Sequence, residues 1–256
     1  MNLNFKTFGQ GFPVVILHGL LGSLDNWQSI AKKLGENFQV YILDQRNHGK
    51  SPHSEEFNYA ILSHDLFDFF YQQGITQAHL IGHSMGGKVA MKFALENPDK
   101  VNKLIVVDIT PAAYPDGHTH IFKGLLQAQV ATVGSREEVE SFLKRNLEED
   151  ETTIQFLMKG LTRPENGADG FIWKFNLSSL YHNYDSISGS VYCDKPFMGS
   201  TLFIRGARSN YINSSNYSDI HHLFPNHELS EIKNAGHWVH AEKPTEFLDE
   251  VIKFLT

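Results

Sequence analysis

The chain has 256 residues, of which 41% are hydrophobic and 20% charged, as in an ordinary globular protein. Its formal net charge of −7 argues against a broad surface for nucleic acid, which needs clustered positive charge. The single cysteine, Cys193, excludes an internal disulfide framework. No apolar run reaches the roughly 20 residues of a membrane span, and the N-terminus lacks a signal-peptide pattern. We therefore expect a cytoplasmic protein without a membrane span, with the choice between monomer and dimer left open.

Short apolar runs alternate with longer helical patterns in the first part of the chain. In chain order the predicted elements are a strand over 14–17, a helix over 27–34, a strand over 40–43, a helix over 59–71, a strand over 79–81, a helix over 85–96 and a strand over 104–107. This alternation implies right-handed crossovers and a mostly parallel sheet. Runs this apolar are typical of a sheet that helices cover on both faces.

Only helical patterns occur between Pro111 and about Gly199. They cover residues 121–133, 135–147, 153–161 and about 177–184. Strand-like runs return at 202–204 and 229–232, and a last helix is predicted over 245–255. A helical block of this length between two strands is typical of an inserted cap rather than a linker. The expected division is a core of residues 1–111 and 199–256 with a helical cap of residues 112–198.

Residues 82–86 read G-H-S-M-G and match the pattern G-x-S-x-G. In this pattern the serine occupies a strained turn between a strand and a helix, and the flanking glycines let the backbone turn tightly. The predicted strand 79–81 and helix 85–96 supply that context. The helix also points its first amides at the place where negative charge would form. The pattern indicates Ser84 as a nucleophile, and a purely structural strand-to-helix loop is the alternative.

A second glycine-containing loop, residues 18–22, follows the predicted strand 14–17. Sites built on such a serine turn bind the oxyanion with the amide of the next residue, here Met85, and with one amide from this loop. Leu20 is the predicted second donor, because Gly19 lets the backbone bring that amide inward. Each donor would contribute about 3 kcal/mol of transition-state stabilisation. A simple turn after a buried strand is the alternative.

His237 is the predicted general base among the 14 histidines. It lies on a loop after the predicted strand 229–232 and before the last helix, from where it can reach a serine at the carboxyl edge of the sheet. It also comes last, in the order Ser, Asp, His that accompanies this serine turn. His240 is the second candidate, and its other expected role is to start a helix or to bind backbone.

These motifs occur in the order typical of α/β-hydrolases, which the chain resembles over nearly its whole length. The resemblance is carried by residues 18–19, 44–51, 82–87 and 236–237. More narrowly, residues 22–27, 46–49, 83–88 and 237–244 resemble small bacterial esterases related to the mitochondrial abhydrolase-11 type, a group associated with short acyl esters and acyl-thioesters. The resemblance implies a mostly parallel eight-stranded α/β-hydrolase sheet flanked by helices, with the helical cap inserted after the sixth strand. It also implies that the Asp, Arg and Gly residues of 44–51 pin the loop behind the oxyanion hole.

The acid that orients the base departs from the usual pattern of this family. In most α/β-hydrolases it follows the penultimate strand, but the loop after 202–204 contains no carboxylate, and Ser209 and Asn210 stand where an aspartate is expected. Asp108 comes directly after the apolar run 104–107, where a charge is costly unless it is paired. We therefore predict Asp108 as the acid, with Ser209 adding a hydrogen bond to His237. A turn cap is the alternative role for Asp108.

The predicted activity is that of a serine carboxylesterase or thioesterase that acts on a small acyl ester or acyl-thioester through an acyl-enzyme, without a metal or cofactor. The elbow aspartate of haloalkane dehalogenases and epoxide hydrolases is replaced by serine, and no H-E-x-x-H zinc motif occurs. Two alternatives stay open: a ligand receptor on the same fold, and a C–C bond hydrolase or perhydrolase with the same triad. The residues expected to bind the acyl group are Leu21, Phe122, Phe171, Trp173 and Trp238, with packing inside the cap as the alternative for each cap ring.

Overall fold

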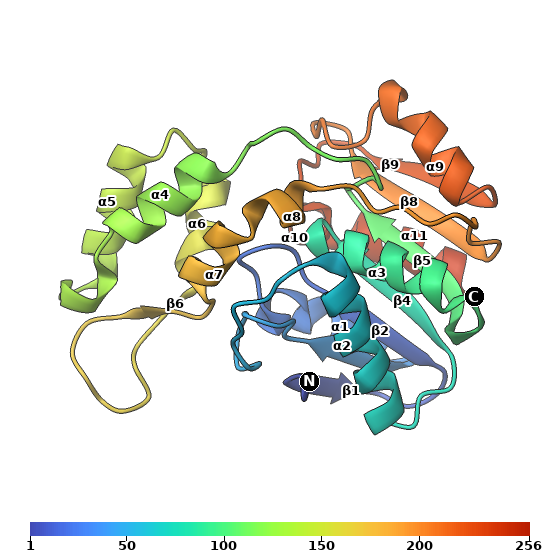
Figure 1. The fold of residues 1–256 in the computed structure, drawn as a ribbon, viewed down its shortest axis with the longest axis horizontal. Helices are drawn as coiled ribbons and strands as arrows, with labels where there is room; N and C mark the ends of the chain where they lie inside the picture. Colours follow the sequence, from blue (N-terminus) through green and yellow to red (C-terminus); the bar gives the residue numbers. More distant parts are fainter.

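A seven-stranded sheet forms the centre of the computed structural model, which describes residues 1–256 (Figure 1). The strands lie in the order β1-β3-β2-β4-β5-β8-β9, and all neighbours are parallel except β1, which pairs antiparallel with β3. The strands are β1 (Phe5–Phe8), β2 (Pro13–Leu17), β3 (Gln39–Leu43), β4 (Ala78–His83), β5 (Val101–Val107), β8 (Ser200–Gly206) and β9 (His227–Ile232). The predicted class of fold, a mostly parallel α/β-hydrolase sheet, is confirmed.

The predicted number of strands is corrected from eight to seven. β1 is the outermost strand at its edge of the sheet, and the four residues before it form no strand. The helical insertion consequently follows β5, the fifth strand of the chain, instead of the sixth.

Side chains that alternate along the strands build a separate core on each face of the sheet. On β2, Val14 and Ile16 belong to one buried cluster, whereas Val15 and Leu17 belong to the other. The cluster of Val14 and Ile16 packs against α1 and α11, and the other packs against α2 and α3. Both faces are therefore covered, as strands this apolar require.

The helices of the chain fall into a core set and a cap set. In chain order they are α1 (Gln28–Leu34), α2 (Tyr59–Gln72), α3 (Met85–Glu96), α4 (Thr119–Gln127), α5 (Arg136–Asn146), α6 (Glu151–Lys159), α7 (Leu177–His182), α8 (Tyr184–Ser188), α9 (Tyr217–Leu223), α10 (Val239–Glu242) and α11 (Pro244–Leu255). Short 3-10 helices cover Leu24–Trp27, Pro98–Lys100, Val130–Thr132 and Ser214–Asn216. Helices α4 to α8 form the cap, which stands beside the sheet in Figure 1.

The cap is not purely helical, which corrects the prediction of helical patterns alone. Strands β6 (Leu161–Thr162) and β7 (Ile172–Trp173) pair antiparallel within it. The β-branched and aromatic side chains of β7 favour an extended backbone. Within the predicted bounds of 112–198, the helices begin at Thr119 and end at Ser188, and the flanking residues connect them to the sheet.

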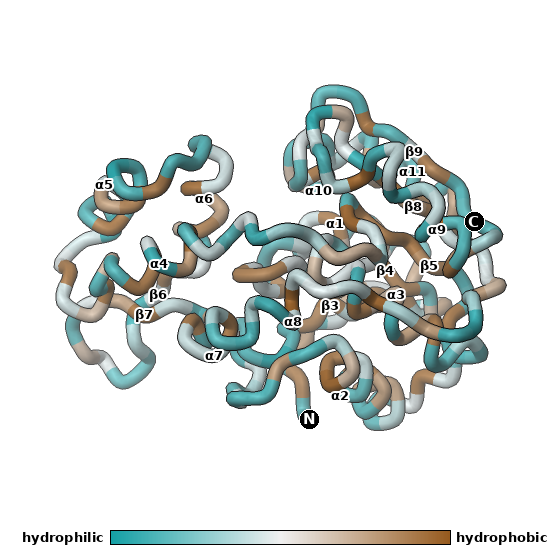
Figure 2. Tube along the Cα trace, turned by 45° about the horizontal axis from the view of Figure 1, so that its top comes forward, coloured by the Kyte–Doolittle hydropathy of each residue, from teal (hydrophilic) through white to brown (hydrophobic).

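The inner strands β2, β3, β4, β5 and β8 are largely hydrophobic and buried, and Figure 2 shows hydrophobic stretches inside the molecule at β4 and β5. None of the helices is both long and apolar enough to cross a membrane. Loops that follow β2, β4, β5, β8 and β9 line one cavity together with residues of the cap. The carboxyl edge of the sheet and the underside of the cap therefore enclose the same space, where ligands bind in open α/β sheets.

Candidate active site

Ser84 occupies a sharp turn between β4 and α3. Its backbone has φ 53° and ψ −122°, a left-handed conformation that is strained for a residue with a side chain. A Cβ atom on Gly82 would collide with the carbonyl oxygen of Gly86, so the turn closes only with glycine at that position. The carbonyl oxygen of Ser84 accepts from the amide of Lys88 at 3.1 Å, which starts α3 directly behind the serine. The conformation is that of a strained strand-to-helix elbow that exposes the serine side chain at the sheet edge.

Asp108 lies beside Ser84 because of the register of the two strands. His83, the last residue of β4, pairs with Val107, the last residue of β5, so Ser84 and Asp108 both follow immediately at the carboxyl edge. Asp108 also has a left-handed backbone, with φ 51°. His237 comes from the loop between β9 and α10, and its Nδ1 lies 2.8 Å from Asp108 Oδ2. The structure thus brings Ser84, Asp108 and His237 to one place.

The carboxylate of Asp108 is fully buried, with 0% exposure, and its oxygens accept from three donors. The amide of Gly206 donates to Oδ1 at 3.1 Å, while Oδ2 accepts from both His237 Nδ1 and the hydroxyl of Ser209. Three donors offset the cost of burying a charge at the end of an apolar strand. The expected bond from Ser209 to His237 is corrected, since the hydroxyl reaches the carboxylate and not the imidazole.

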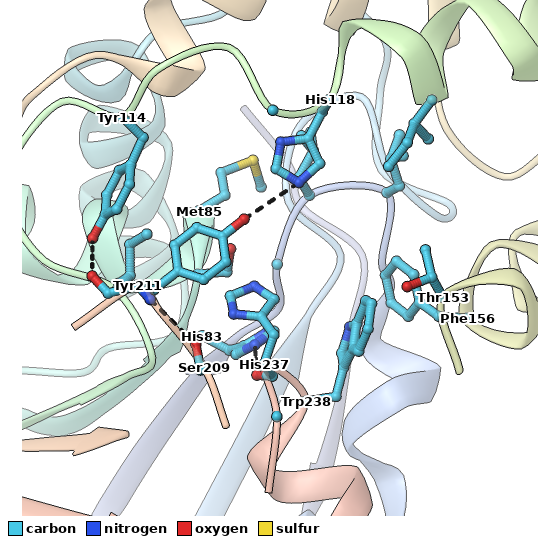
Figure 3. A pocket seen from close by; sticks show the side chains of 18 of the residues that line it. His83, Met85, Tyr114, His118, Thr153, Phe156, Ser209, Tyr211, His237 and Trp238 are labelled. Carbon is cyan, nitrogen blue, oxygen red and sulfur yellow. Dashed lines mark hydrogen bonds between the residues drawn. The ribbon is translucent and has the colours of Figure 1, made fainter. Parts of the chain in front are cut away.

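Two aromatic rings, those of Tyr211 and His83, contact the His237 imidazole. Tyr211 stacks on it with ring centroids 4.2 Å apart and an angle of 26°, and His83 lies on another side at 4.7 Å (Figure 3). The amide of Tyr211 donates to Ser209 Oγ at 3.3 Å, which ties the stacked ring to the hydroxyl beside Asp108. His83 Nε2 donates to the carbonyl oxygen of His237 at 2.9 Å. Burial lowers the pKa of His83 well below its usual value, so this ring is neutral.

His240 does not share this environment. Its ring stacks on Trp27 with centroids 4.0 Å apart and an angle of 8°, and it is buried behind His83. It does not line the cavity. Burial lowers the pKa of His240 to about 3. The structure therefore places the second candidate base in the core beneath the site.

The loop 19–22 approaches Ser84 closely enough to supply an oxyanion donor. A Cβ on Gly19 would lie 3.3 Å from Ser84 Cβ and 2.9 Å from His83 Nδ1, so glycine is needed for this approach. The amide of Leu20 makes no hydrogen bond within the chain. Met85 is the first residue of α3, where amides have no partner inside the helix. Both predicted amides therefore lie at the cavity with their hydrogens free for a ligand.

Two buried histidines, His18 and His48, hold this loop. The sequence does not predict this role for them, although both lie in the motif stretches 18–19 and 44–51. Leu21 has φ 60°, and its amide donates to His48 Nε2 at 3.2 Å. His48 therefore carries its proton on Nδ1, which donates to the carbonyl oxygen of Arg46 at 2.8 Å. In the same way His18 Nε2 accepts from the amide of Gln45 at 3.0 Å. Burial lowers the pKa of both histidines, as their acceptor roles require.

The segment 44–51 supports the loop only in part as expected. Asp44 accepts from the amide of Leu24 at 2.8 Å and from that of Lys50 at 2.9 Å. Arg46 instead pairs with Asp65 on α2 at 2.7 Å, away from the loop. The side-chain contacts to the loop 19–22 come from His18 and His48. They could not be predicted from the sequence, because it does not show which backbone groups face each ring.

A cavity of about 790 Å³ is lined by Ser84 and His237 on the core side and by residues of the cap on the other. Its apolar lining comes from both sides and includes Leu20, Leu21, Met85, Ile109, Ile121, Phe156, Leu157 and Trp238. Phe156 of the cap packs against Trp238 of the core, with ring centroids 5.1 Å apart (Figure 3). Leu21 and Trp238 thus line the cavity, as the sequence predicts for acyl-binding residues.

The structure does not bring Phe122, Phe171 or Trp173 to the cavity. Phe122 is fully buried and packs against rings of α7 and α8, the nearest being Tyr184 at 5.3 Å. Trp173 stacks on Phe175 at 5.5 Å, and Phe171 lies under the Arg163 guanidinium at 4.0 Å. These rings pack the cap onto itself, which is the alternative that their aromatic character also allows.

Comparisons with known proteins identify the family of this chain. The family model described as the alpha/beta hydrolase fold matches residues 13–244. An sn-1-specific diacylglycerol lipase ABHD11 from Danio rerio is 40% identical over an alignment of 268 positions, which covers 100% of this chain and 83% of the relative. Esterase YbfF from Escherichia coli is 35% identical, covering 95% of this chain and 92% of the relative. A solved structure of a marine microorganism esterase superposes with a TM-score of 0.94 at 39% identity, covering 98% of both chains. Because the family model and these relatives match nearly the whole chain, the protein belongs to the α/β-hydrolase family, among its ester hydrolases.

Proposed function

We propose that this protein is a serine esterase in which Ser84 is the nucleophile, His237 the general base and Asp108 the acid. The observation that carries the proposal is the 2.8 Å contact between His237 Nδ1 and a buried carboxylate, at the sheet edge where the elbow serine lies. Because Nδ1–H donates to Asp108, Nε2 is left unprotonated and able to accept the proton of a serine hydroxyl. The other histidines with a carboxylate partner, His64 and His120, lie on α2 and on α4 of the cap, away from the sheet edge.

The reaction follows from these positions. The Ser84 hydroxyl adds to the ester carbonyl while His237 takes its proton, and the amides of Leu20 and Met85 bind the oxyanion that forms. His237 then gives the proton to the leaving alcohol, and the acyl group stays on Ser84. Water, deprotonated by the same imidazole, hydrolyses the acyl-enzyme and restores the serine.

The charges around the cavity favour esters of neutral alcohols over coenzyme A thioesters. Asp116, Glu149 and Asp150 line the cavity on the cap side. Of the cations there, Arg208 is paired with Glu242 at 2.8 Å, and Lys88 is buried with all its close contacts on backbone carbonyls. A polyphosphate leaving group would meet like charge, whereas a neutral alkyl or glyceryl group would not.

Ester turnover tests the proposal against a ligand receptor on the same fold. p-Nitrophenyl butyrate should be hydrolysed over many turnovers, and a fluorophosphonate should label Ser84 alone. Ser84→Ala should lose about 10⁶-fold in kcat while keeping its fold. A single burst of nitrophenol without a steady state would support the receptor instead.

Two thioesters separate chemistry from charge. S-butyryl-N-acetylcysteamine is a neutral thioester and should be hydrolysed with a kcat/KM near that of the oxygen ester. Butyryl-CoA carries the same acyl group on a polyanion and should be poorer by about tenfold or more at low ionic strength, with the gap narrowing in salt. Equal rates for both thioesters would contradict the electrostatic part of the proposal.

The cytoplasmic location expected from the sequence stays a prediction. Its support is the single cysteine, which is free and partly buried, in keeping with a reducing compartment. Fractionation of cells that express the tagged chain would test it, and recovery in a membrane or secreted fraction would contradict it.

A further inference from the structure

Lys88 is a buried cation that the proposed reaction does not use. It lies on α3 one turn after Ser84, and only 1% of its surface is exposed. Its ammonium donates to the carbonyl oxygens of Ala112 at 2.7 Å and of Gly189, with Ser188 O at 3.4 Å. None of these partners is a carboxylate, and burial lowers the pKa of Lys88 to about 7. A buried charge held only by carbonyl dipoles is costly, so its retention calls for a role.

The three carbonyls belong to the two segments that join the cap to the core. Ala112 lies on the segment that leaves β5 for the cap, whereas Ser188 is the last residue of α8 and Gly189 begins the segment that returns to β8. The two segments bind each other as well, through Tyr114 N to Ser188 O at 2.9 Å and Val191 N to Pro111 O at 2.8 Å. Figure 1 shows both connections, green and orange, passing over α3. Lys88 therefore lies where both cap connections pass α3, the helix that follows Ser84.

Two tyrosines complete the surroundings of the ammonium. The rings of Tyr114 and Tyr59 lie 4.9 and 5.8 Å from Lys88 Nζ, within the range of a cation–π contact. The Tyr59 hydroxyl donates to the carbonyl oxygen of Ile187 at 2.5 Å. The core thus binds three consecutive carbonyls, 187 to 189, at the end of α8 and the start of the return connection. An apolar side chain in place of Lys88 would fill the space without binding the carbonyls of Ala112, Ser188 and Gly189.

We propose that Lys88 is a positioning residue for the ester hydrolysis proposed above: its ammonium clamps both cap connections to α3 and so fixes the cap side of the cavity relative to Ser84. The residues next to the clamp support this role, since 114–118 and 187–188 all line the cavity. Loosening the clamp would move the surface against which the acyl group packs. The serine, its base and the oxyanion amides belong to the core and would stay in place.

Lys88→Met tests the clamp, because it keeps the unbranched apolar stem and removes the charge and the donors. Lys88→Gln, which retains an amide donor, is the milder second variant. Lys92→Met is the control: Lys92 lies one turn further along α3 and pairs with Glu96 at 3.0 Å, and its single contact with either connection is a long one to Tyr192 O at 3.4 Å. Hydrogen exchange reports on peptides that cover 111–118 and 186–193, and circular dichroism confirms the fold.

We expect exchange in both connections of Lys88→Met to speed up by about tenfold or more, the effect of losing hydrogen bonds to a charged donor, with α2 and β4 unchanged. KM for p-nitrophenyl butyrate should rise by a similar factor, while the rate of phosphonylation of Ser84 by a small fluorophosphonate stays within about twofold of wild type. Lys88→Gln should show the same pattern with smaller changes, and Lys92→Met should leave both the exchange of 111–118 and KM at their wild-type values.

The clamp would be overturned if a folded Lys88 variant exchanged hydrogen in both connections at the wild-type rate. It would also be overturned if the exchange rate rose uniformly over the whole chain. These measurements need no turnover, so they stand apart from the proposed function. That function fails instead if wild-type Ser84 is not phosphonylated and esters are not turned over.

Discussion

The hydroxyl of Ser209 donates to Asp108 Oδ2, the same oxygen that accepts from His237 Nδ1. Ser209 stands at the position where most members of the family carry the acid itself, while Asp108 holds the carboxylate one strand earlier. The hydroxyl therefore reaches the carboxylate from the loop that carries the acid in most members of the family. It supplies a donor to a charge that is fully buried.

Asp108→Asn should lower kcat by about 10⁴-fold, because the amide would favour the wrong tautomer of His237. Ser209→Ala should cost much less, about fivefold, the effect of one hydrogen bond. The measurement is kcat for p-nitrophenyl butyrate, with circular dichroism to confirm folding. A folded Asp108→Asn enzyme at a near wild-type rate would refute Asp108 as the acid.

His48 should control the oxyanion loop. His48→Leu removes the acceptor for the Leu21 amide, leaves that donor unsatisfied and frees the loop, so we expect kcat to fall by about 10- to 100-fold with little change in KM. His48→Gln offers a side-chain oxygen to the same amide and should restore most of the rate. Inhibition by a trifluoromethyl ketone, which forms an oxyanion on the serine, should weaken in parallel with kcat/KM. A fall in kcat without any loss of ketone affinity would mean that the loop is not the cause.

Phe156 should set the preference for acyl chain length, because its ring lines the cavity against Trp238. Phe156→Ala should change the ratio of kcat/KM between short and long p-nitrophenyl esters by about tenfold. Phe122→Ala is the matched control, since this ring is buried inside the cap and outside the cavity. It should lower the free energy of unfolding by about 3–5 kcal/mol and leave the ratio unchanged. An altered ratio in Phe122→Ala alone would reverse the two assignments.

Acid should destabilise the protein through its buried neutral histidines. Burial lowers the pKa of His240 to about 3 and that of His118 to about 4, both below the value in an unfolded chain. Below about pH 6.5 the unfolded state therefore binds protons that the folded state does not, and stability falls as pH falls, by about 1.4 kcal/mol per pH unit for each group.

His240→Phe tests this linkage, since phenylalanine can keep the stack on Trp27 and cannot titrate. Urea unfolding at pH 7, 6 and 5 gives the slope of the unfolding free energy with pH. We expect the variant to have a slope smaller by about 1.4 kcal/mol per pH unit between pH 6 and 5. An unchanged slope would show that His240 is protonated in the folded state.

Features that depend on a few neighbouring residues could be predicted from the amino-acid sequence alone. The elbow at Ser84 needs a strand, two close glycines and a helix, all within about 20 residues, and each leaves a pattern that can be read. Asp108 is conspicuous because a carboxylate directly after four apolar residues must find a partner. The order of strands along the chain then sends both residues, with the loop of His237, to one sheet edge.

Features that depend on contacts between two distant loops could be seen only in the folded chain. The turn at Ser209 directs its hydroxyl to Asp108 and not to His237, and His48 binds the Leu21 amide across 27 residues of chain. The sequence could not distinguish Phe156, which lines the cavity, from Phe122, which is buried inside the cap. Both are phenylalanines on predicted cap helices, and only the folded cap shows which ring faces the cavity. Lys88 reads in sequence as one more helical lysine, and its place beneath both cap connections arises only when the cap docks. Such contacts are specified by the packing of whole elements, and local sequence patterns carry no record of it.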